Sequence, residues 1–191
     1  LLVKRDVVRH NYPHCWRCGS PLIYLSSRQW FLSVKRIKEL MIEGNKKVEW
    51  KPKWAGENRF GDWLTNAEDW GISRTKICGS LMRREPFVMD TWLDSGMAHT
   101  ASIDGLRNKE LFRKLFPYDF ITEAIDQTRG WFYTLLFTST LLYGMPPYKM
   151  VLNQGHVLDA EGRKMSKSRG NVIWAIDMIN KYGADPLRFY L

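Results

Sequence analysis

Two short stretches near the start of the chain combine β-branched and aromatic residues in the manner of strands. They cover residues 22–25 and 30–34 and predict two short strands. In residues 33–43 the apolar positions recur every three or four residues, which predicts an amphipathic helix. Pro52 and Gly56 are turn-forming residues and predict a loop after that helix.

The pattern of the last third predicts a strand–helix–strand unit. Residues 119–125 predict a strand, a helix follows from residue 126 or 127 to 143, and residues 149–153 predict a second strand. Two strands joined by one helix within about 35 residues form a right-handed crossover with parallel strands. A sheet of this kind is covered on both faces. The pattern is therefore that of an α/β protein.

Shorter elements flank this unit. Residues 61–67 predict a short helix, 71–74 the start of a strand, and 175–181 a final helix. A long loop rich in Gly and Lys, residues 155–171, leaves the second strand of the crossover. Because ligands bind at the carboxyl ends of parallel strands, we expect this loop and residues 126–131 to lie beside one crevice.

Composition fits a folded domain with a basic front. The 191 residues are 45% hydrophobic and 14% aromatic, which excludes wholesale disorder. The chain holds 29 Lys and Arg against 20 Asp and Glu, and residues 1–60 hold 13 of the basic and 5 of the acidic residues. Such a segment suits a neighbouring polyanion such as tRNA, and it equally suits a solvated basic face.

Cysteine content, hydropathy and the ends of the chain indicate where the protein is located and whether it is part of a larger one. Three cysteines are too few for a disulfide framework and suit a reducing compartment, so we expect a cytoplasmic protein. The most apolar stretch, residues 131–145, falls short of the roughly 20 apolar residues of a membrane span, so we expect no membrane partner. Charges at residues 4–6 argue against a signal peptide. The chain starts at Leu1 and stops at Leu191 within a pattern, so we expect it to be part of a larger protein.

The sharpest chemical pattern is Lys-Met-Ser-Lys-Ser at residues 164–168, with glycines at 162 and 170. Two lysines three positions apart are mobile charges suited to phosphate groups, and the serines add hydroxyl donors. The flanking glycines let the loop move as a lid. On charge alone a solvated basic loop fits as well. The complete string, however, resembles the signature of class I aminoacyl-tRNA synthetases.

Five further motifs extend this resemblance. They are Tyr-Pro-His-Cys-Trp-Arg-Cys at 12–18, Asp-Trp-Gly-Ile-Ser-Arg at 69–74, Asp-Thr-Trp-Leu-Asp-Ser-Gly at 90–96, Asp-Gln-Thr-Arg-Gly-Trp-Phe-Tyr at 126–133 and Lys-Tyr-Gly-Ala-Asp at 181–185. Together they resemble the isoleucyl-tRNA synthetases over nearly the whole chain. The Asp-Gln-Thr-Arg-Gly-Trp block favours the isoleucyl enzymes over their valyl, leucyl and methionyl relatives.

The resemblance implies a fold, a domain division and a reaction. Residues 61–191 would be the second half of a Rossmann-like parallel-sheet catalytic domain that ends with the Lys-Met-Ser-Lys-Ser loop. Residues 1–60 would be an irregular α+β connective segment that returns from an editing insertion. The parent enzyme would be an isoleucine–tRNA ligase, with ATP and Mg²⁺, isoleucine and tRNA(Ile) as its partners.

The resemblance also implies roles for particular residues. Lys164 and Lys167 would hold the β- and γ-phosphates while the isoleucine carboxylate attacks the α-phosphate. The ATP and adenylate site would further comprise Glu123, Asp126, Gln127, Gln154, Ser166 and Ser168. By residue type alone, Asp126 equally suits a helix N-cap.

Two tryptophans match those that line the amino-acid pocket of the relatives. Trp92 and Trp131 would present flat rings to an aliphatic side chain. Isoleucine differs from valine by one methylene, which a pocket distinguishes by only about 1–3 kcal/mol. Without the resemblance, both belong to the core, because the chain has nine tryptophans.

Cys15 and Cys18 have the spacing of a zinc knuckle. Two thiolates are half of a tetrahedral site, and the resemblance implies a second cysteine pair beyond the editing insertion, so Zn²⁺ would belong to the full-length parent. His10 and Cys78 are unconvincing additional ligands, and His14 is poorly placed. We expect His99 in a loop.

The chain departs from the family in several places, which include Trp174-Ala175 where the family has Asp-Pro and the absence of the editing pocket. It lacks the His-Ile-Gly-His signature, its segment between Arg74 and Asp90 is short, and Ala124 stands where the family has glycine. We therefore expect the chain alone to be inactive. Two alternatives stay open: a non-catalytic module that binds tRNA or a protein, and a sister synthetase for valine or another aliphatic amino acid.

Overall fold

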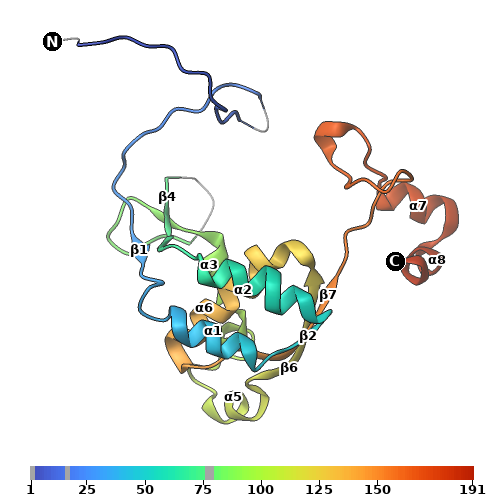
Figure 1. Ribbon diagram of the computed structural model, residues 1–191. Coiled ribbons are helices and arrows are strands. Elements are labelled where there is room, and N and C mark those ends of the chain that lie inside the picture. Colours follow the sequence, from blue (N-terminus) through green and yellow to red (C-terminus); the bar gives the residue numbers. More distant parts are fainter. Residues whose placement is uncertain (1–2, 16–17, 76–79) are drawn as a thin grey trace. The chain divides into compact units, whose positions relative to one another are not determined.

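The computed structural model describes residues 3–15, 18–75 and 80–191, with only the backbone of Ser168 (Figure 1). Its contacts divide the chain into two compact units. Residues 29–156 form the larger one, which we call the sheet unit. Residues 1–28 and 157–191 make up the smaller one, the loop unit. Residue 60, where we predicted a domain boundary, falls within the sheet unit.

Three parallel strands form the main sheet, in the order β2–β7–β6 (Figure 1). β2 is Glu49–Lys51, β6 is Tyr118–Ala124 and β7 is Tyr148–Gln154. The last residues of β6 and β7, Ala124 and Gln154, lie opposite each other. The parallel pairing of β6 with β7 confirms the predicted crossover and the α/β class.

The helix of the crossover, α6 (Trp131–Tyr143), is the centre of the core. Its residues 132–140 are all buried, because it packs with Val151 of the sheet and with α1 (Lys38–Lys46). A helix that is apolar all round requires such cover on several sides. It ends at Gly144, whose φ of 70° is left-handed and favours glycine, as predicted from the sequence.

The opposite face of the sheet carries apolar side chains without cover. The alternation of strand side chains puts Phe120 and Leu152 on the same face of the sheet. They are 57% and 44% exposed, so that face is not covered. The expectation of cover on both faces is therefore wrong for the described part of the chain.

Short elements complete the sheet unit. Two antiparallel ribbons join β1 (Phe31–Leu32) to β3 (Trp70–Gly71), and β4 (Ser73–Arg74) to β5 (Val88–Met89). The remaining helices are the π-helix η1 (Ala55–Phe60), α2 (Gly61–Thr65), α3 (Thr91–Gly96), α4 (Ala98–Ala101), the 3₁₀-helix η2 (Ile125–Arg129) and α5 (Lys109–Leu115).

Two predictions for the front of the chain are wrong, and a third has the right element with shifted bounds. Residues 22–25 form no strand, and their apolar side chains are exposed because no neighbouring strand pairs with them. The helix predicted over 33–43 begins only at Lys38, after a turn whose Val34 N–H is bonded to the Asp69 carboxylate. Gly56 lies in the π-helix rather than in a loop, where a Cβ would meet the Trp50 ring at 2.2 Å.

The C-terminal part of the loop unit is helical at its end. The 3₁₀-helix η3 (Lys167–Arg169) lies in the long loop, followed by α7 (Ala175–Tyr182) and α8 (Ala184–Tyr190). The sequence predicted α7 but not α8, which contains Pro186 in its first turn, where proline is tolerated. No helix in the described residues is long and apolar enough to cross a bilayer.

Candidate active site

The paired ends of β6 and β7 form the base of the candidate site in the sheet unit. Gln154 donates from Nε2 to Thr122 Oγ1 at 3.1 Å, so its amide is fixed across the two strands. Glu123 lies opposite Asn153 and its side chain is exposed. Carboxyl ends of parallel strands are the edge at which α/β proteins bind ligands. Glu123 and Gln154 are therefore both at the predicted edge.

The 3₁₀-helix η2 leads from β6 into α6 and carries Asp126 and Gln127. The Gln127 amide accepts the backbone N–H of Trp131 at 2.8 Å and donates to Asp126 Oδ2 at 3.3 Å. Gln127 thus satisfies the start of α6, and the exposed Asp126 carboxylate does not bond the helix backbone. The helix-cap alternative for Asp126 is not supported, and its carboxylate is open to a ligand hydroxyl group.

A residue that sequence reasoning missed holds η2 in place. Thr128 is fully buried and donates from Oγ1 to the carbonyl of Ile125 at 2.8 Å. The same hydroxyl accepts from Arg59 Nε at 3.1 Å, and Arg59 comes from the π-helix η1. A hydrogen bond that joins residues 69 positions apart leaves no local pattern in the sequence.

The structure brings Trp92, Gln127 and Trp131 together. Trp131 donates from Nε1 to the carbonyl of Ser95 in α3 at 2.9 Å. A Cβ on Gly130 would lie 2.6 Å from Gln127 Oε1 and 3.2 Å from Cη2 of Trp92. Only glycine fits between these side chains without displacing one of them. Trp92 is 42% exposed, whereas Trp131 is partly buried and packs against the hydrophobic core.

The Lys-Met-Ser-Lys-Ser loop belongs to the loop unit. Lys164 and Lys167 have exposed side chains, and Lys167 Nζ lies 5.3 Å from the centroid of the Trp174 ring. Ser166 donates its backbone N–H to Asn171 Oδ1 at 2.9 Å, and its hydroxyl accepts from Arg169 N at 3.3 Å. The side chain of Ser168 lies outside what the structure describes. The two ammonium groups are thus accessible to an anionic ligand.

Asp159 braces this loop from its base. Its carboxylate accepts from Asn171 Nδ2 at 2.8 Å, from the Arg163 backbone at 2.7 Å and from Arg163 Nε at 3.0 Å. These donors, the Asn171 amide foremost, lower the pKa of Asp159 to about 2. The carboxylate therefore stays ionised at neutral pH and ties residue 159 to residue 171 across the loop.

Cys15 and Cys18 lie in a tight turn of the loop unit. Gly19 N–H donates to the Cys15 carbonyl and Cys15 N–H to the Ser20 carbonyl, each at 2.8 Å. Hydrogen bonds from Ser20, its side chain foremost, lower the pKa of Cys18 to about 7.

A complete metal site does not occur in the described residues, which hold no group of three or more potential ligands. The Nδ1 atom of His14 is within 2.6 Å of the Gly19 carbonyl, and Cys78 lies outside the described residues. The residues present fit half of a zinc site and not a whole one.

His99 was expected in a loop but lies buried in α4. Its ring nitrogens bond Thr100 Oγ1 at 2.8 Å and Thr138 Oγ1 at 3.0 Å. Burial lowers its pKa to about 4. His99 therefore joins α4 to α6 as a neutral side chain and has no place among the candidate ligand contacts.

The parallel sheet with its crossover helix, followed along the chain by the Lys-Met-Ser-Lys-Ser string, is the pattern of a class I synthetase domain. The fold supports this class, since the chain superimposes on Mycobacterium tuberculosis methionyl-tRNA synthetase bound by methionyl-adenylate with a TM-score of 0.69. That match has 22% identity and covers 94% of this chain and 36% of the other. A family model described as tRNA synthetases class I (I, L, M and V) matches residues 5–83 and 78–191. The chain belongs to this family.

Relatives within the family carry one particular name. The isoleucine–tRNA ligase of Pyrobaculum aerophilum is 44% identical over 245 aligned residues, which cover all of this chain and 25% of that protein. The isoleucine–tRNA ligase of Methanothermobacter marburgensis is 41% identical over all of this chain and 23% of its own length. This chain thus spans about a quarter of the length of the curated relatives that it matches.

Proposed function

We propose that this chain is part of an enzyme that activates isoleucine with ATP and transfers it to tRNA(Ile). The observation that carries the proposal is the cluster of Trp92, Gln127 and Trp131 beside the polar ends of β6 and β7. It combines a flat apolar wall with hydrogen-bonding groups at the edge where α/β sheets bind ligands. The similarity to isoleucine–tRNA ligases names the amino acid.

The first step forms isoleucyl-adenylate. A carboxylate oxygen of isoleucine bonds to the α-phosphorus of ATP, the bond to the bridging oxygen breaks, and pyrophosphate leaves with the electron pair. Mg²⁺ enters with ATP as part of the substrate. Negative charge grows on the leaving phosphates, so the step depends on positioned positive charge. Lys164 and Lys167 supply that charge, and Ser166 and Ser168 supply hydroxyl donors.

The sheet unit would hold the ribose and the amino acid of the adenylate. Asp126, Gln127 and Glu123 offer acceptors for ribose hydroxyls and for the amino group of isoleucine. Gln154 adds an amide that Thr122 already orients. The indoles of Trp92 and Trp131 enclose the aliphatic side chain.

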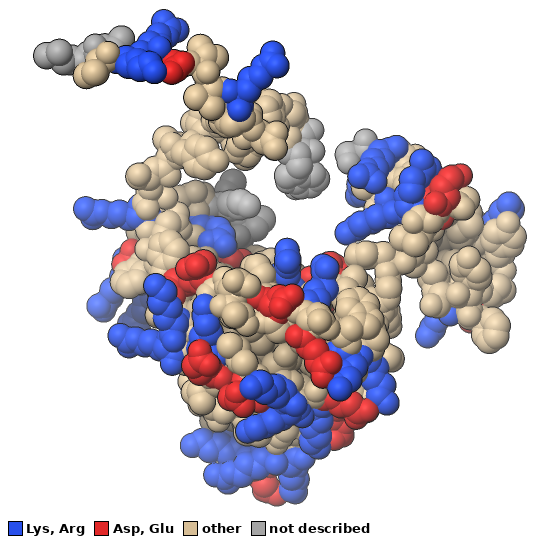
Figure 2. Space-filling model, in the orientation of Figure 1, with Lys and Arg blue, Asp and Glu red and all other residues tan. Residues whose placement is uncertain are grey.

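The second step passes the acyl group to the terminal ribose of tRNA, which breaks the bond to the phosphate and releases AMP. Basic residues of the first 60 positions suit a polyanion, although some of them are paired. Lys46, Lys51 and Lys53 each form an ion pair with a nearby glutamate, and Lys4 forms one with Asp6. Figure 2 shows acidic and basic side chains interspersed in the sheet unit. We assign tRNA attraction to the unpaired basic residues of this segment, in a protein of the cytoplasm.

The decisive test is pyrophosphate exchange by the full-length gene product, assayed in parallel with isoleucine, valine, leucine and methionine. We expect exchange with isoleucine and none from the isolated chain. A preference for valine would make the protein a sister synthetase, and no exchange with any of the four would make it a binding module.

The role of the loop is tested by Lys167→Ala in the same protein. We expect the exchange rate to fall by roughly 10²–10³, which is typical for the loss of one preorganised charge contact. Lys114→Ala is the matched control, because Lys114 is an exposed lysine whose partner is Glu110 on the same helix. Equal rates in the two variants would reject the role of Lys167.

A further inference from the structure

We propose that the ion pair between Asp90 and Arg74 positions the two indoles of the isoleucine pocket and thereby sets the discrimination between isoleucine and valine. The inference rests on the proposed function. Neither residue touches the ligand in this assignment, so both are positioning residues. Hydrogen bonds lead from the buried Asp90 carboxylate to Trp92 and, through α3, to Trp131.

Asp90 is the most heavily bonded carboxylate in the described part of the sheet unit. It is 7% exposed, and its Oδ2 accepts from Arg74 Nη2 at 2.5 Å and from Trp70 Nε1 at 3.2 Å. Its Oδ1 accepts from the backbone N–H of Trp92 at 3.2 Å. One carboxylate thus fixes both the ribbon before it and the helix after it.

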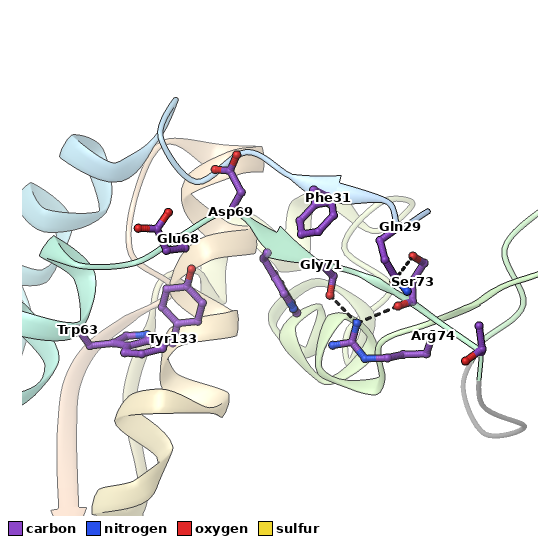
Figure 3. Close-up of a pocket in the computed structure, with 11 residues that line it drawn as sticks. Gln29, Phe31, Trp63, Glu68, Asp69, Gly71, Ser73, Arg74 and Tyr133 are labelled. Atoms are coloured by element: carbon purple, nitrogen blue, oxygen red, sulfur yellow. Dashed lines mark hydrogen bonds between the residues drawn. The ribbon is translucent and has the colours of Figure 1, made fainter. Parts of the chain in front are cut away.

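Arg74 is held as firmly as its partner. The guanidinium donates from Nη1 to the carbonyls of Gly71 at 2.7 Å and Ser73 at 2.9 Å (Figure 3). Its planar donors are therefore spread over β3, β4 and Asp90, an arrangement that a lysine cannot reproduce. The side chain lies at the wall of a cavity of about 560 Å³ in the sheet unit, lined also by Trp70 and Tyr133.

The helix that Asp90 caps carries the pocket. α3 begins at Thr91 with Asp90 as its N-cap, so Trp92 is the second residue of the helix. The carbonyl of Ser95, one turn later, accepts from Trp131 Nε1 at 2.9 Å. The position of α3 therefore fixes the backbone of Trp92 and the indole ring of Trp131.

The far end of α3 is pressed against α6. A Cβ on Gly96 would lie 3.0 Å from Thr134 Cβ, and Thr138 donates from Oγ1 to the Gly96 carbonyl at 2.6 Å. α3 is thus clamped at one end by close packing and at the other by the ion pair. If the ion pair is lost, the free end is the one that carries Trp92.

The pair, with a buried carboxylate and an arginine side chain that is 36% exposed, is a weak source of stability, because desolvation of Asp90 offsets much of the attraction. Its use here is directional: Arg74 can satisfy Asp90 in one arrangement of the ribbon and the helix. A pocket that separates substrates by one methylene must hold its walls still, because an aliphatic contact has no direction of its own. The Asp90–Arg74 pair fixes the orientation of the pocket walls without contacting the ligand.

The test compares Asp90→Asn, Arg74→Gln and the double variant in the full-length gene product, by pyrophosphate exchange. Asn keeps one oxygen to cap α3, but its amide nitrogen carries no charge and cannot accept from Arg74 or Trp70. We expect the KM for isoleucine to rise about tenfold, the KM for ATP to change less than twofold, and the preference for isoleucine over valine to fall. The double variant should be no worse than the worse single variant, because the contact is already lost.

Asp104→Asn is the matched control, since Asp104 forms an exposed pair with Arg107 at 3.6 Å. It should leave both KM values unchanged. Arg74→Lys keeps the positive charge without the fork, and it should show a smaller version of the same isoleucine-specific defect. If Asp90→Asn does not fold at the assay temperature, the two Arg74 variants decide by the same ratio of KM values.

Different results refute the positioning role and the proposed function. An active wild type whose variants keep the KM for isoleucine and the amino-acid preference would overturn the positioning role. Equal changes in the KM for isoleucine and for ATP would also overturn it, since they indicate a general structural defect. A wild type without any isoleucine-dependent exchange would refute the proposed function itself, and the pocket with it.

Discussion

Acidification tests the buried histidine without any assumption about function. His99 is 3% exposed, and aromatic rings of Phe116 and Tyr143 lie within 6 Å of it, with centroid distances of 5.9 and 5.8 Å. Its ring nitrogens bond two threonine hydroxyls, which carry no charge. A proton on this ring would meet an apolar surrounding with no anion to stabilise it.

The size of the effect follows from the pKa of His99. Burial lowers it from 6.5 to about 4, so between these values the unfolded chain binds a proton that the folded chain does not. Stability therefore rises with pH across this window and levels off above it. At about 1.4 kcal/mol per pKa unit, the folded state should lose roughly 3 kcal/mol between pH 7 and pH 4 through this group.

The measurement is urea unfolding of the chain from pH 4 to pH 8, followed by tryptophan fluorescence, for the wild type and for His99→Gln. Gln is neutral throughout and can still bond Thr138. It should be less stable than the wild type at pH 8, and the gap should shrink toward pH 4, because only the histidine is penalised by acid. A gap of constant size across this range would refute the buried neutral histidine.

Two further predictions follow from contacts within the separate units. Gly56→Ala should lower the unfolding free energy by about 1–3 kcal/mol, the usual range for overpacking, because the new Cβ would meet the Trp50 ring at 2.2 Å. Urea titration measures this change. Gly144→Asn is the control, because a Cβ at Gly144 has no atom within 4 Å. Asp159→Asn should speed trypsin cleavage after Lys164 and Lys167, because the hydrogen bonds from Arg163 to this side chain weaken. Cleavage as slow as in the wild type would show that Asp159 does not brace the loop.

The crossover was predictable because its signals are local and strong. α6 is rich in apolar residues along its 13 positions, interrupted only by Thr and Ser, and Gly144 marks its end. β2 was missed because Glu49–Lys51 has charged residues on both sides of Trp50, and only pairing with β7 makes it a strand. Residues 22–25 show the reverse case, in which a strand-like pattern has no partner to pair with.

The site was predictable where a contiguous motif carried it, as in the Asp126–Trp131 block. It was not predictable where the contact joins distant residues. Arg74 and Asp90 stand 16 positions apart, and only the fold shows that they meet. One signal was available: Asp is favoured before a helix, and the residues after Asp90 suit one. No comparable local signal marked Arg74 as the partner of Asp90.

The two kinds of candidate ligand contact differ in rigidity, and their chemistry explains why. In the proposed function Lys164 and Lys167 would act on phosphates through charge, which tolerates small displacements because it weakens slowly with distance. Exposed side chains on a braced loop are sufficient for that task. Trp92 and Trp131 would act on an aliphatic group by contact alone, and a gap of half an ångström forfeits about a quarter or more of each contact. Tryptophans held by Ser95, Gln127 and the Asp90–Arg74 pair meet that stricter demand.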